Sequence, residues 1–279
     1  LQHSLLDEAL RLELDILVVQ GKSSARVLDR VVRVMHPVGH VLAEDVEGEE
    51  AQNNYSEQLI RFKNRPTSMQ YSKTMESVKV RERKHEHDMI KIGIAHSLFK
   101  LTPRFDSILE EISQVTDNIE FIFFETNKIH AAQIKSRWLE TAPNTLRKSR
   151  FHPKVELERF IEIIQGFDIM LDPIGFGAGT VCYQAMACGV PLVSLPTNQL
   201  KTRAAVGCYK KMGISRPPIA KNEREYAEIC RELIESNDRR FELSQEIALK
   251  AKTKLYNQTT VLKEFEIFVR DAVSHKRKN

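Results

Sequence analysis

The alternation of apolar and polar positions is regular only in the later part of the chain. Short apolar runs at 89–95, 120–125, 150–152, 167–172 and 191–195 have the length of buried strands. Between them, residues 103–115, 130–139, 157–165 and 180–187 have the spacing of helices, and further helices are expected up to residue 273. Strands that alternate with helices predict βαβ units on a parallel sheet.

The first 75 residues are less regular. Residues 5–17 have helical spacing, whereas 16–19 and 31–35 read as short strands and 44–54 as an acidic loop. Residues 75–88 are highly charged and read as a linker or an exposed helix. So few strands do not predict an independent α/β domain.

Composition sets the broad class. The chain has 279 residues, of which 42% are hydrophobic and 29% charged, as in globular proteins. The net charge of +4 suits an anionic ligand but falls short of a nucleic-acid-binding signature. The longest apolar run, 183–196, is too short to span a membrane.

Cysteine usage and the first residues bear on location. The four cysteines contain no CxxC pair and do not predict a disulfide scaffold, which favours a reducing compartment. Asp7 and Glu8 interrupt the opening segment, which does not read as a secretory signal. We therefore expect a cytoplasmic protein, and the missing initial Met suggests a fragment or a processed start.

The first loop whose residues suit ligand binding is 96–103, directly after the strand at 89–95. Thr102 suits the N-cap and Pro103 the first position of the next helix. Lys100 then lies at the edge of the sheet where parallel α/β proteins bind ligands. A lysine beside a helix N-terminus suits a phosphate, and the alternative is a solvated surface lysine.

The second loop is 172–180, with glycines at 175, 177 and 179. Glycines let a backbone approach a ligand closely, although tight packing alone also requires them. Thr180 can cap the following helix or bond a phosphate oxygen, and Gln184, one turn further, can reach a ribose hydroxyl. The loop matches neither GxGxxG nor a Walker motif.

Other chemistries find little support in the sequence. His85 and His87 lie close together, but no pattern joins them to further metal ligands, so we expect no metal site. The GxSxG elbow of serine hydrolases is absent from the sequence.

Several segments, taken in order, resemble a known family. Residues 96–106 (HSLFKLTPRFD) are similar to its QSLFKLHPDFD, 171–180 (LDPIGFGAGT) to LDPFHFGGGNT, and 183–196 (YQAMACGVPLVSLP) to YEALAMGTPVVTLP. Residues 203–213, 36–38 and 50–61 resemble further segments. The family is that of O-GlcNAc transferases and SPINDLY-like proteins, glycosyltransferase family 41. The resemblance is strongest over residues 92–233 and fainter over 31–71.

The resemblance implies an α/β fold of GT-B type, in which two Rossmann-like domains enclose the sugar nucleotide. It implies inverting transfer of a sugar, N-acetylglucosamine or another hexose, from UDP to a protein Ser or Thr hydroxyl. The UDP-sugar is the donor substrate, and neither metal nor cofactor is implied. We expect 1–80 to be a reduced N-terminal Rossmann-like domain with a linker, and 81–279 to be the nucleotide-sugar-binding domain with closing helices.

The resemblance also assigns residues. Lys100 corresponds to a contact of the donor diphosphate, and Gln184 stands where the family has an acidic ribose ligand. Val181 replaces a second Thr or Asn of the diphosphate loop. The full set of expected donor-binding residues is Ser97, Lys100, Val155, Gly179, Thr180, Val181 and Gln184, with Val155 bordering the uracil.

Catalysis stays open at this point. His36 is the candidate base with family support, and a structural histidine before Pro37 is the alternative. Much of the family's N-terminal domain has no counterpart here, so a non-catalytic or split-enzyme nucleotide-sugar-binding module is the second hypothesis. An epimerase-like enzyme on a related frame is a third. The expected partners are a nucleotide sugar, a protein acceptor, and an oligomer or partner subunit that supplies the missing half.

Overall fold

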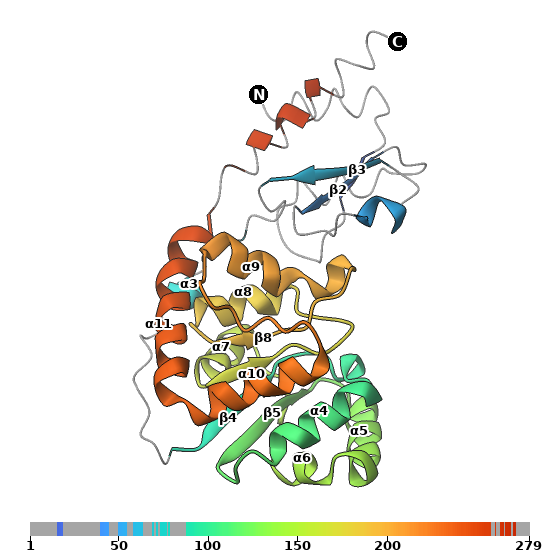
Figure 1. Cartoon of the computed structure of the whole chain (residues 1–279), viewed down its shortest axis with the longest axis vertical. Helices are drawn as coiled ribbons and strands as arrows, with labels where there is room; N and C mark the ends of the chain where they lie inside the picture. The colour runs from blue at the N-terminus through green and yellow to red at the C-terminus, as the bar shows by residue number, and fades with distance from the viewer. Residues whose placement is uncertain are drawn as a thin grey trace. The chain divides into compact units, whose positions relative to one another are not determined.

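The structure is a computed structural model. It describes residues 16–18, 40–44, 50–54, 58–63, 69, 71, 73–76, 78, 88–257, 260, 263–264, 266–268 and 270–271 (Figure 1). The chain divides into two compact units, Leu1–Gln70 with Tyr256–Asn279, and Tyr71–Leu255. The sequence placed the boundary at 80/81 and assigned the C-terminal residues to the second domain.

The first unit contains a three-stranded parallel sheet in the order β1-β2-β3. Its strands are β1 (Ile16–Val18), β2 (His40–Glu44) and β3 (Gln58–Phe62), and the short helix η1 (Ala51–Asn54) precedes β3. Strand β1 confirms the predicted strand at 16–19, whereas β2 was not foreseen. The expected strand at 31–35 and the candidate base His36 lie outside the described residues.

The end of the chain joins this unit through contacts with β3. The ring of Phe62 packs edge-on against that of Phe268, with centroids 6.1 Å apart, and the Lys63 amide donates to Glu264. These contacts are consistent with the grouping of residues 256–279 with the first unit.

The second unit is built on a five-stranded sheet in the order β6-β5-β4-β7-β8, with every pair parallel. The strands are β4 (Ile90–Ile94), β5 (Ile119–Glu125), β6 (Ser149–Pro153), β7 (Ile169–Leu171) and β8 (Leu192–Val193). All five predicted strands are confirmed. Residues on the central strands, Ile92, Ile94, Phe121 and Phe123, are fully buried, because helices cover a parallel sheet on both faces.

Most helices pack around one of two helices (Figure 1). Helix α4 (Pro103–Ser113) contacts α5 (Lys128–Thr141), α6 (Pro143–Arg147) and α10 (Glu223–Glu235). Helix α8 (Thr180–Ala187) contacts α7 (Leu157–Gln165), α9 (Ala204–Met212) and α11 (Asn237–Lys254). Helix α10 also contacts α11. The remaining short elements are α3 (Lys73–Glu76), η2 (Leu98–Lys100) and η3 (Leu200–Thr202).

Helix boundaries follow local chemistry. The predicted bounds of α7 and α8 are confirmed, and the apolar face of α4 (Phe105, Ile108, Leu109 and Ile112) is buried as expected. The sequence did not predict α6, a helix of five residues that begins at Pro143. A single turn has too few positions to show a helical period, so side chains from α4 determine it.

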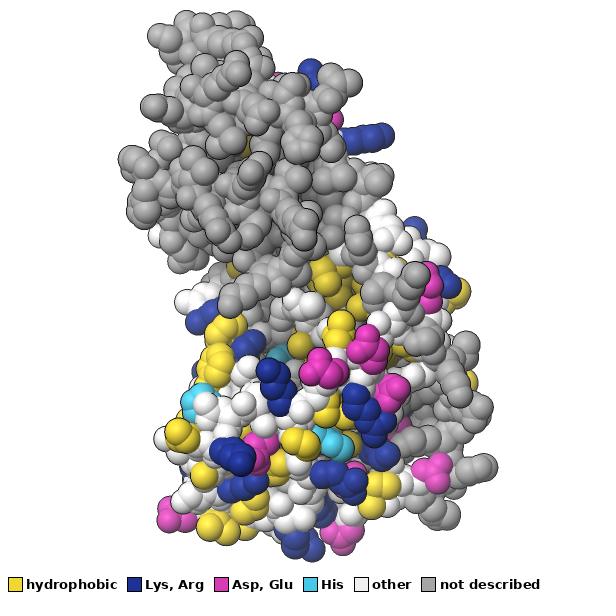
Figure 2. Space-filling model, turned by 180° about the vertical axis from the view of Figure 1, so that it is seen from behind, with side chains coloured by type: hydrophobic (Ala, Val, Ile, Leu, Met, Phe, Trp, Pro, Cys, Tyr) yellow, Lys and Arg dark blue, Asp and Glu magenta, His cyan; other side chains and the backbone are white. Residues whose placement is uncertain are grey.

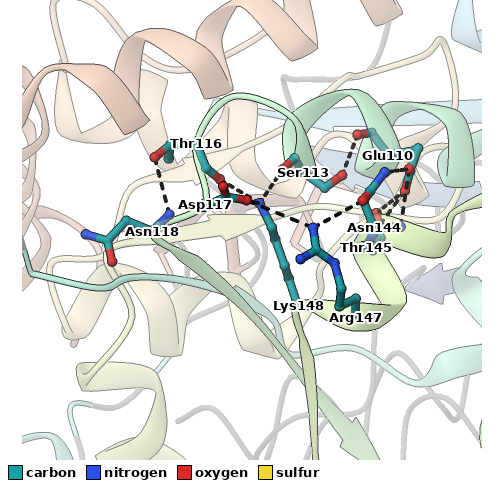
Figure 3. A network of polar contacts seen from close by, with 9 residues as sticks. All are labelled: Glu110, Ser113, Thr116, Asp117, Asn118, Asn144, Thr145, Arg147 and Lys148. Carbon is teal, nitrogen blue, oxygen red and sulfur yellow. Dashed lines mark hydrogen bonds and ion pairs between the residues drawn. The ribbon is translucent and has the colours of Figure 1, made fainter.

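Figure 3 shows these side chains: a residue of α4 caps the start of α6, and a residue at the end of α6 caps the end of α4. The Glu110 carboxylate accepts from the backbone N–H groups of Asn144 and Thr145, at 3.3 and 3.0 Å, at the start of α6. The Lys148 ammonium donates to the carbonyls of Ser113 and Thr116, both at 2.8 Å, at the end of α4. The start of α6 has backbone N–H groups, and the end of α4 has carbonyl groups, that find no partner within their own helix. The Glu110 and Lys148 side chains provide these partners.

Candidate functional site

The order of the strands identifies the edge at which a ligand is expected. The chain proceeds from β4 outward to β5 and β6, then returns to add β7 and β8 on the other side of β4. The connections that follow β4 and β7, which are neighbours in the sheet, therefore lead toward opposite edges of the sheet. In open parallel sheets, ligands bind in the crevice between two such connections. These are the two loops that the sequence singled out.

The loop after β4 forms the single turn η2. Ser97 is exposed and begins this turn, and buried Leu98 anchors it. Thr102 occupies the N-cap of α4 with Pro103 in the first turn, as predicted. The Thr102 side chain makes no capping hydrogen bond to any residue that the structure describes, so this helix start is set by backbone geometry.

The loop after β7 runs from Asp172 to Gly179. Gly175 has φ 85°, a conformation that favours glycine, and a Cβ added at Gly177 would lie 2.7 Å from the nearer Asp172 carboxylate oxygen. Gly179 is the N-cap of α8, and Thr180 is its first helical residue. The expectation that Thr180 caps this helix is therefore wrong, because the loop enters the helix one residue earlier.

The two loops contact one another through Lys100. Its ammonium donates to the Gly177 carbonyl at 2.9 Å and lies 4.0 Å from the centre of the Phe176 ring. The Gly177 amide donates to the Lys201 carbonyl at 3.0 Å, which holds the same residue from its other side. Lys100 is half-buried; burial lowers its pKa, and the Asp172 carboxylate opposes that shift. It is not a freely solvated surface lysine.

Beneath this contact lies Asp172, which the sequence analysis did not assign to the site. One carboxylate oxygen accepts from the Ala178 amide at 2.6 Å, and the other accepts from the Ser194 hydroxyl at 2.8 Å. Burial raises the pKa of Asp172 to about 6, although both hydrogen bonds and Lys100 lower it. An aspartate between a buried strand and a glycine-rich turn was the available signal in the sequence.

His96 completes the buried group. Its Nε2 atom lies 3.6 Å from Asp172 Oδ1, too far for a hydrogen bond, and has no hydrogen-bond partner among the described residues. Burial, with a smaller contribution from Lys100, lowers the pKa of His96 to about 3. The imidazole is therefore neutral at physiological pH.

The start of α8 supplies backbone donors at the same edge. A helix leaves the N–H groups of its first turn without acceptors of its own, and here they belong to Gly179, Thr180 and Val181. A Cβ added at Gly179 would have no described atom within 4 Å, so this side of the peptide is open. Gln184, one turn further, is 8% exposed. This end of α8 can receive an anion.

Val155 follows β6, which is not adjacent to either of the strands, β4 and β7, that the two loops follow. It is half-buried between the end of β6 and the start of α7, at the same edge of the sheet but separated from β4 by strand β5. The neighbouring Phe160 packs on Phe124, with ring centroids 4.8 Å apart. The structure thus brings together Lys100, Gly179 and Thr180 with the loop around them, and leaves Val155 apart.

The rim of this site is aromatic, a feature that the sequence analysis did not identify. Phe99 and Phe176 are 59% and 42% exposed, and their rings meet edge-on at 6.2 Å. His130 also contacts Phe99, with ring centroids 6.2 Å apart. Aromatic rings beside an ammonium form a surface that accepts both apolar and cationic contacts.

Charged side chains, and side chains of the types that bind metals, occur throughout the described part of the chain. On the face shown in Figure 2, Lys and Arg side chains are interspersed with acidic, apolar and His side chains. Within the described part of the chain, no group of three or more His, Cys, Asp or Glu side chains is placed to hold a metal ion. In that same part, no helix combines the length and the apolar character needed to cross a membrane.

Comparison with known sequences gives a partial relationship. No protein-family model matches the chain. The UDP-glucose:protein N-beta-glucosyltransferase of Actinobacillus pleuropneumoniae serotype 5b is 24% identical over 163 residues, which is 57% of this chain and 26% of that protein. The chain thus spans about a quarter of the length of the curated relatives it matches.

Comparison with solved structures confirms the fold. The Thermobaculum terrenum O-GlcNAc transferase (K341M mutant) superposes with a TM-score of 0.75 at 15% identity, over 99% of this chain and 56% of that one. WaaG, a glycosyltransferase involved in lipopolysaccharide biosynthesis, gives a TM-score of 0.57 at 11% identity, over 91% and 74%. The expected α/β fold of GT-B type, a Rossmann-like parallel sheet flanked by helices, is therefore confirmed.

Proposed function

We propose that this chain binds a UDP-sugar and belongs to a glycosyltransferase that modifies proteins. The observation that carries the proposal is the contact of Lys100 with Gly177, which joins the two loops at the ligand edge of the sheet. The similarity to a UDP-glucose:protein N-beta-glucosyltransferase, and the Anabaena HepE structure in complex with UDP and glucose (TM-score 0.56, 12% identity, 98% of this chain and 76% of that one), support the same ligand class.

The diphosphate is the part of the donor that these groups suit. An ammonium has three N–H donors, and Gly177 occupies one of those of Lys100, so two remain for phosphate oxygens. The amides at the start of α8 supply fixed donors and the positive end of the helix dipole. Sugar transfer leaves negative charge on the departing UDP, and preformed donors stabilise that charge.

The remaining residues are proposed to contact the UDP-sugar because of their positions in the fold. Ser97 is exposed in the first loop, and Gln184 lies one turn inside α8, where its amide can bond a ribose hydroxyl. Val155 would border the base at the end of β6. His36 remains the proposed catalytic base and lies outside the described residues.

Calorimetric titration with UDP, with GDP as the control nucleotide, tests the donor site directly. We expect micromolar binding of UDP and none of GDP. Absence of binding by either nucleotide would refute the proposal. Release of UDP from UDP-glucose or UDP-N-acetylglucosamine then distinguishes a transferase from a binding module without catalysis.

The matched variants are Lys100→Ala and Lys91→Ala. Lys91 is exposed and belongs to β4, whose opposite end leads to Lys100. Loss of a charge-assisted hydrogen bond is expected to weaken UDP binding by about tenfold or more for Lys100→Ala, while Lys91→Ala binds like the unaltered chain. Equal affinities for the two variants would show that the diphosphate does not contact Lys100.

The acceptor is the second part of the proposal. The resemblance favours a protein Ser or Thr hydroxyl, whereas the name of the Actinobacillus relative favours a protein nitrogen. Mass spectrometry of a modified acceptor peptide distinguishes the two, because O-linked and N-linked sugars are lost differently under base. An oligomer or partner subunit and a cytoplasmic location remain parts of this proposal, to be checked by light scattering and cell fractionation.

A further inference from the structure

The Asp172 carboxylate links three segments of the second unit. It is 2% exposed and follows β7 directly. Through the Ser194 hydroxyl it is tied to the end of β8, and through the Ala178 amide to the glycine-rich loop. Hydrogen bonds to an ionised acceptor are stronger than neutral ones, so this loop is attached to the sheet at a defined point.

The loop also packs directly on this carboxylate. A Cβ at Gly177 would lie 2.7 and 3.1 Å from the two carboxylate oxygens; the first distance is shorter than Cβ atoms adopt and the second is tight. Only a residue without a side chain fits between the loop and Asp172. The carboxylate therefore fixes the distance of the loop from the sheet by packing, in addition to holding it by a hydrogen bond.

The loop in turn fixes Lys100. The Gly177 carbonyl accepts the hydrogen bond of the Lys100 ammonium, and Gly177 is bonded covalently to Ala178, which Asp172 holds. Displacement of the Asp172–Ala178 contact would shift the Gly177 carbonyl and remove the fixed partner of the ammonium.

We propose that Asp172 is a positioning residue for the donor site: it holds the glycine-rich loop, and through Gly177 the Lys100 ammonium, in the arrangement that binds the donor diphosphate. This inference rests on the proposed function. It implies that substitution of Asp172 or Ser194 weakens ligand binding, and not only the stability of the fold as for any buried polar residue.

The chain offers a control for each variant. Asp168 is also buried and lies at the opposite end of β7, where its carboxylate accepts from the Lys91 amide at 2.8 Å. Ser113 is as buried as Ser194, and its hydroxyl donates to the Glu110 carbonyl at 2.6 Å. The comparisons are Asp172→Ala with Asp168→Ala, and Ser194→Ala with Ser113→Ala.

Two measurements separate positioning from stability, and both are made well below each variant's melting temperature. UDP affinity by calorimetry is expected to fall by about tenfold or more in Asp172→Ala and by a smaller factor in Ser194→Ala. Asp172→Asn is expected to recover most of the affinity, because its amide oxygen can still accept from Ala178. The controls are expected to bind UDP like the unaltered chain, whatever their melting temperatures.

Hydrogen exchange of the free protein supplies the second measurement. Amides of residues 174–181 are expected to exchange faster in Asp172→Ala and Ser194→Ala than in the controls. If the unaltered chain binds UDP but both Asp172→Ala and Ser194→Ala bind it equally tightly, the inference is wrong and the proposed function stands. If the unaltered chain binds no UDP, the proposed function fails and this inference fails with it. If only Ser194→Ala folds, its affinity and exchange rates against Ser113→Ala decide the outcome.

Discussion

At the scale of single residues, His96 and Asp172 form a buried pair whose two pKa values move in opposite directions. Burial raises the pKa of Asp172 from 3.8 to about 6 and lowers that of His96 from 6.5 to about 3. Lys100 lowers the pKa of both groups, by less than burial shifts them. The Asp172 carboxylate in turn raises the pKa values of the buried Tyr209 and Tyr226. The two tyrosines have raised pKa values, so they stay neutral in acid.

The consequences for stability have opposite signs. Between about pH 4 and pH 6, Asp172 holds a proton in the folded chain and loses it on unfolding, so its contribution to the free energy of unfolding falls as pH rises. In the same range His96 is neutral when folded and gains a proton on unfolding, so its contribution rises with pH. Each effect approaches about 1.4 kcal/mol per pH unit, and together they nearly cancel.

Substitution of one residue of the pair should expose the pH dependence that the other residue gives to the free energy of unfolding. Relative to the unaltered chain, the free energy of unfolding of Asp172→Asn is expected to rise with pH between about 4 and 6, because only His96 then titrates. That of His96→Gln is expected to fall with pH over the same range. Urea unfolding at half-unit intervals of pH measures both, and curves parallel to that of the unaltered chain would contradict the buried-pair interpretation.

At the scale of elements, most strands and helices were predictable because burial follows a period along the sequence. Strand β4 and helix α7 are examples in which the apolar pattern and the bounds agree. Helix α6 depends instead on a carboxylate from α4. Such tertiary causes leave no local pattern in the sequence.

The same distinction applies to the candidate site. The position of Lys100 and of the glycine-rich loop at one edge of the sheet could be predicted, because each directly follows a strand of a parallel sheet. The assignments of Ser194 and His96 could not be predicted, because they depend on which side chains become buried beside one another. Asp172 had a signal in its place between a buried strand and a glycine-rich turn, but the sequence did not show which residues it contacts. Their roles follow from distances that only the assembled sheet defines.

The cap that Glu110 provides to α6 gives a prediction at this scale. Burial raises the pKa of Glu110, but hydrogen bonds from Thr145 and Asn144 outweigh burial and lower it below its usual value. A lowered carboxyl pKa stabilises the fold above the unfolded pKa, and this stabilisation is lost as pH falls through the folded pKa. Glu110→Ala is expected to cost about 1 kcal/mol at neutral pH, the usual value of a lost helix cap.

The measurement is urea unfolding of Glu110→Ala and Glu111→Ala at pH 7 and in mild acid. Glu111 is the next residue on α4 and is exposed, so its removal has the same effect on helix propensity without loss of the cap. We expect the difference in stability between the two variants to narrow in acid. A difference that stays constant with pH would show that the charge of Glu110 does not contribute.

At the scale of the whole molecule, the second unit contains every described group assigned to the donor site. The two loops, the five-stranded sheet and all helices from α3 to α11 lie within Tyr71–Leu255. We therefore expect residues 71–255 expressed alone to unfold cooperatively and to bind UDP with an affinity within about threefold of the full chain, a difference of less than about 1 kcal/mol.

Circular dichroism melting and calorimetry of this shorter chain test the expectation. Lys100→Ala in the same background serves as the control for specific binding. A folded 71–255 that fails to bind UDP, while the full chain binds it, would show that the donor site also needs groups from the first unit.

The hydrogen bond between Lys100 and Gly177 also has a consequence for the order of folding. Its two residues are 77 positions apart in the chain, and β5 and β6 lie between them in sequence. A folding intermediate that has paired β4 with β5 but has not yet added β7 cannot make this bond. If UDP requires it, nucleotide binds only to molecules in which β7 has joined β4, and it draws partially folded chains toward that state by mass action. Retention on immobilised UDP would then select correctly folded molecules from a refolding mixture.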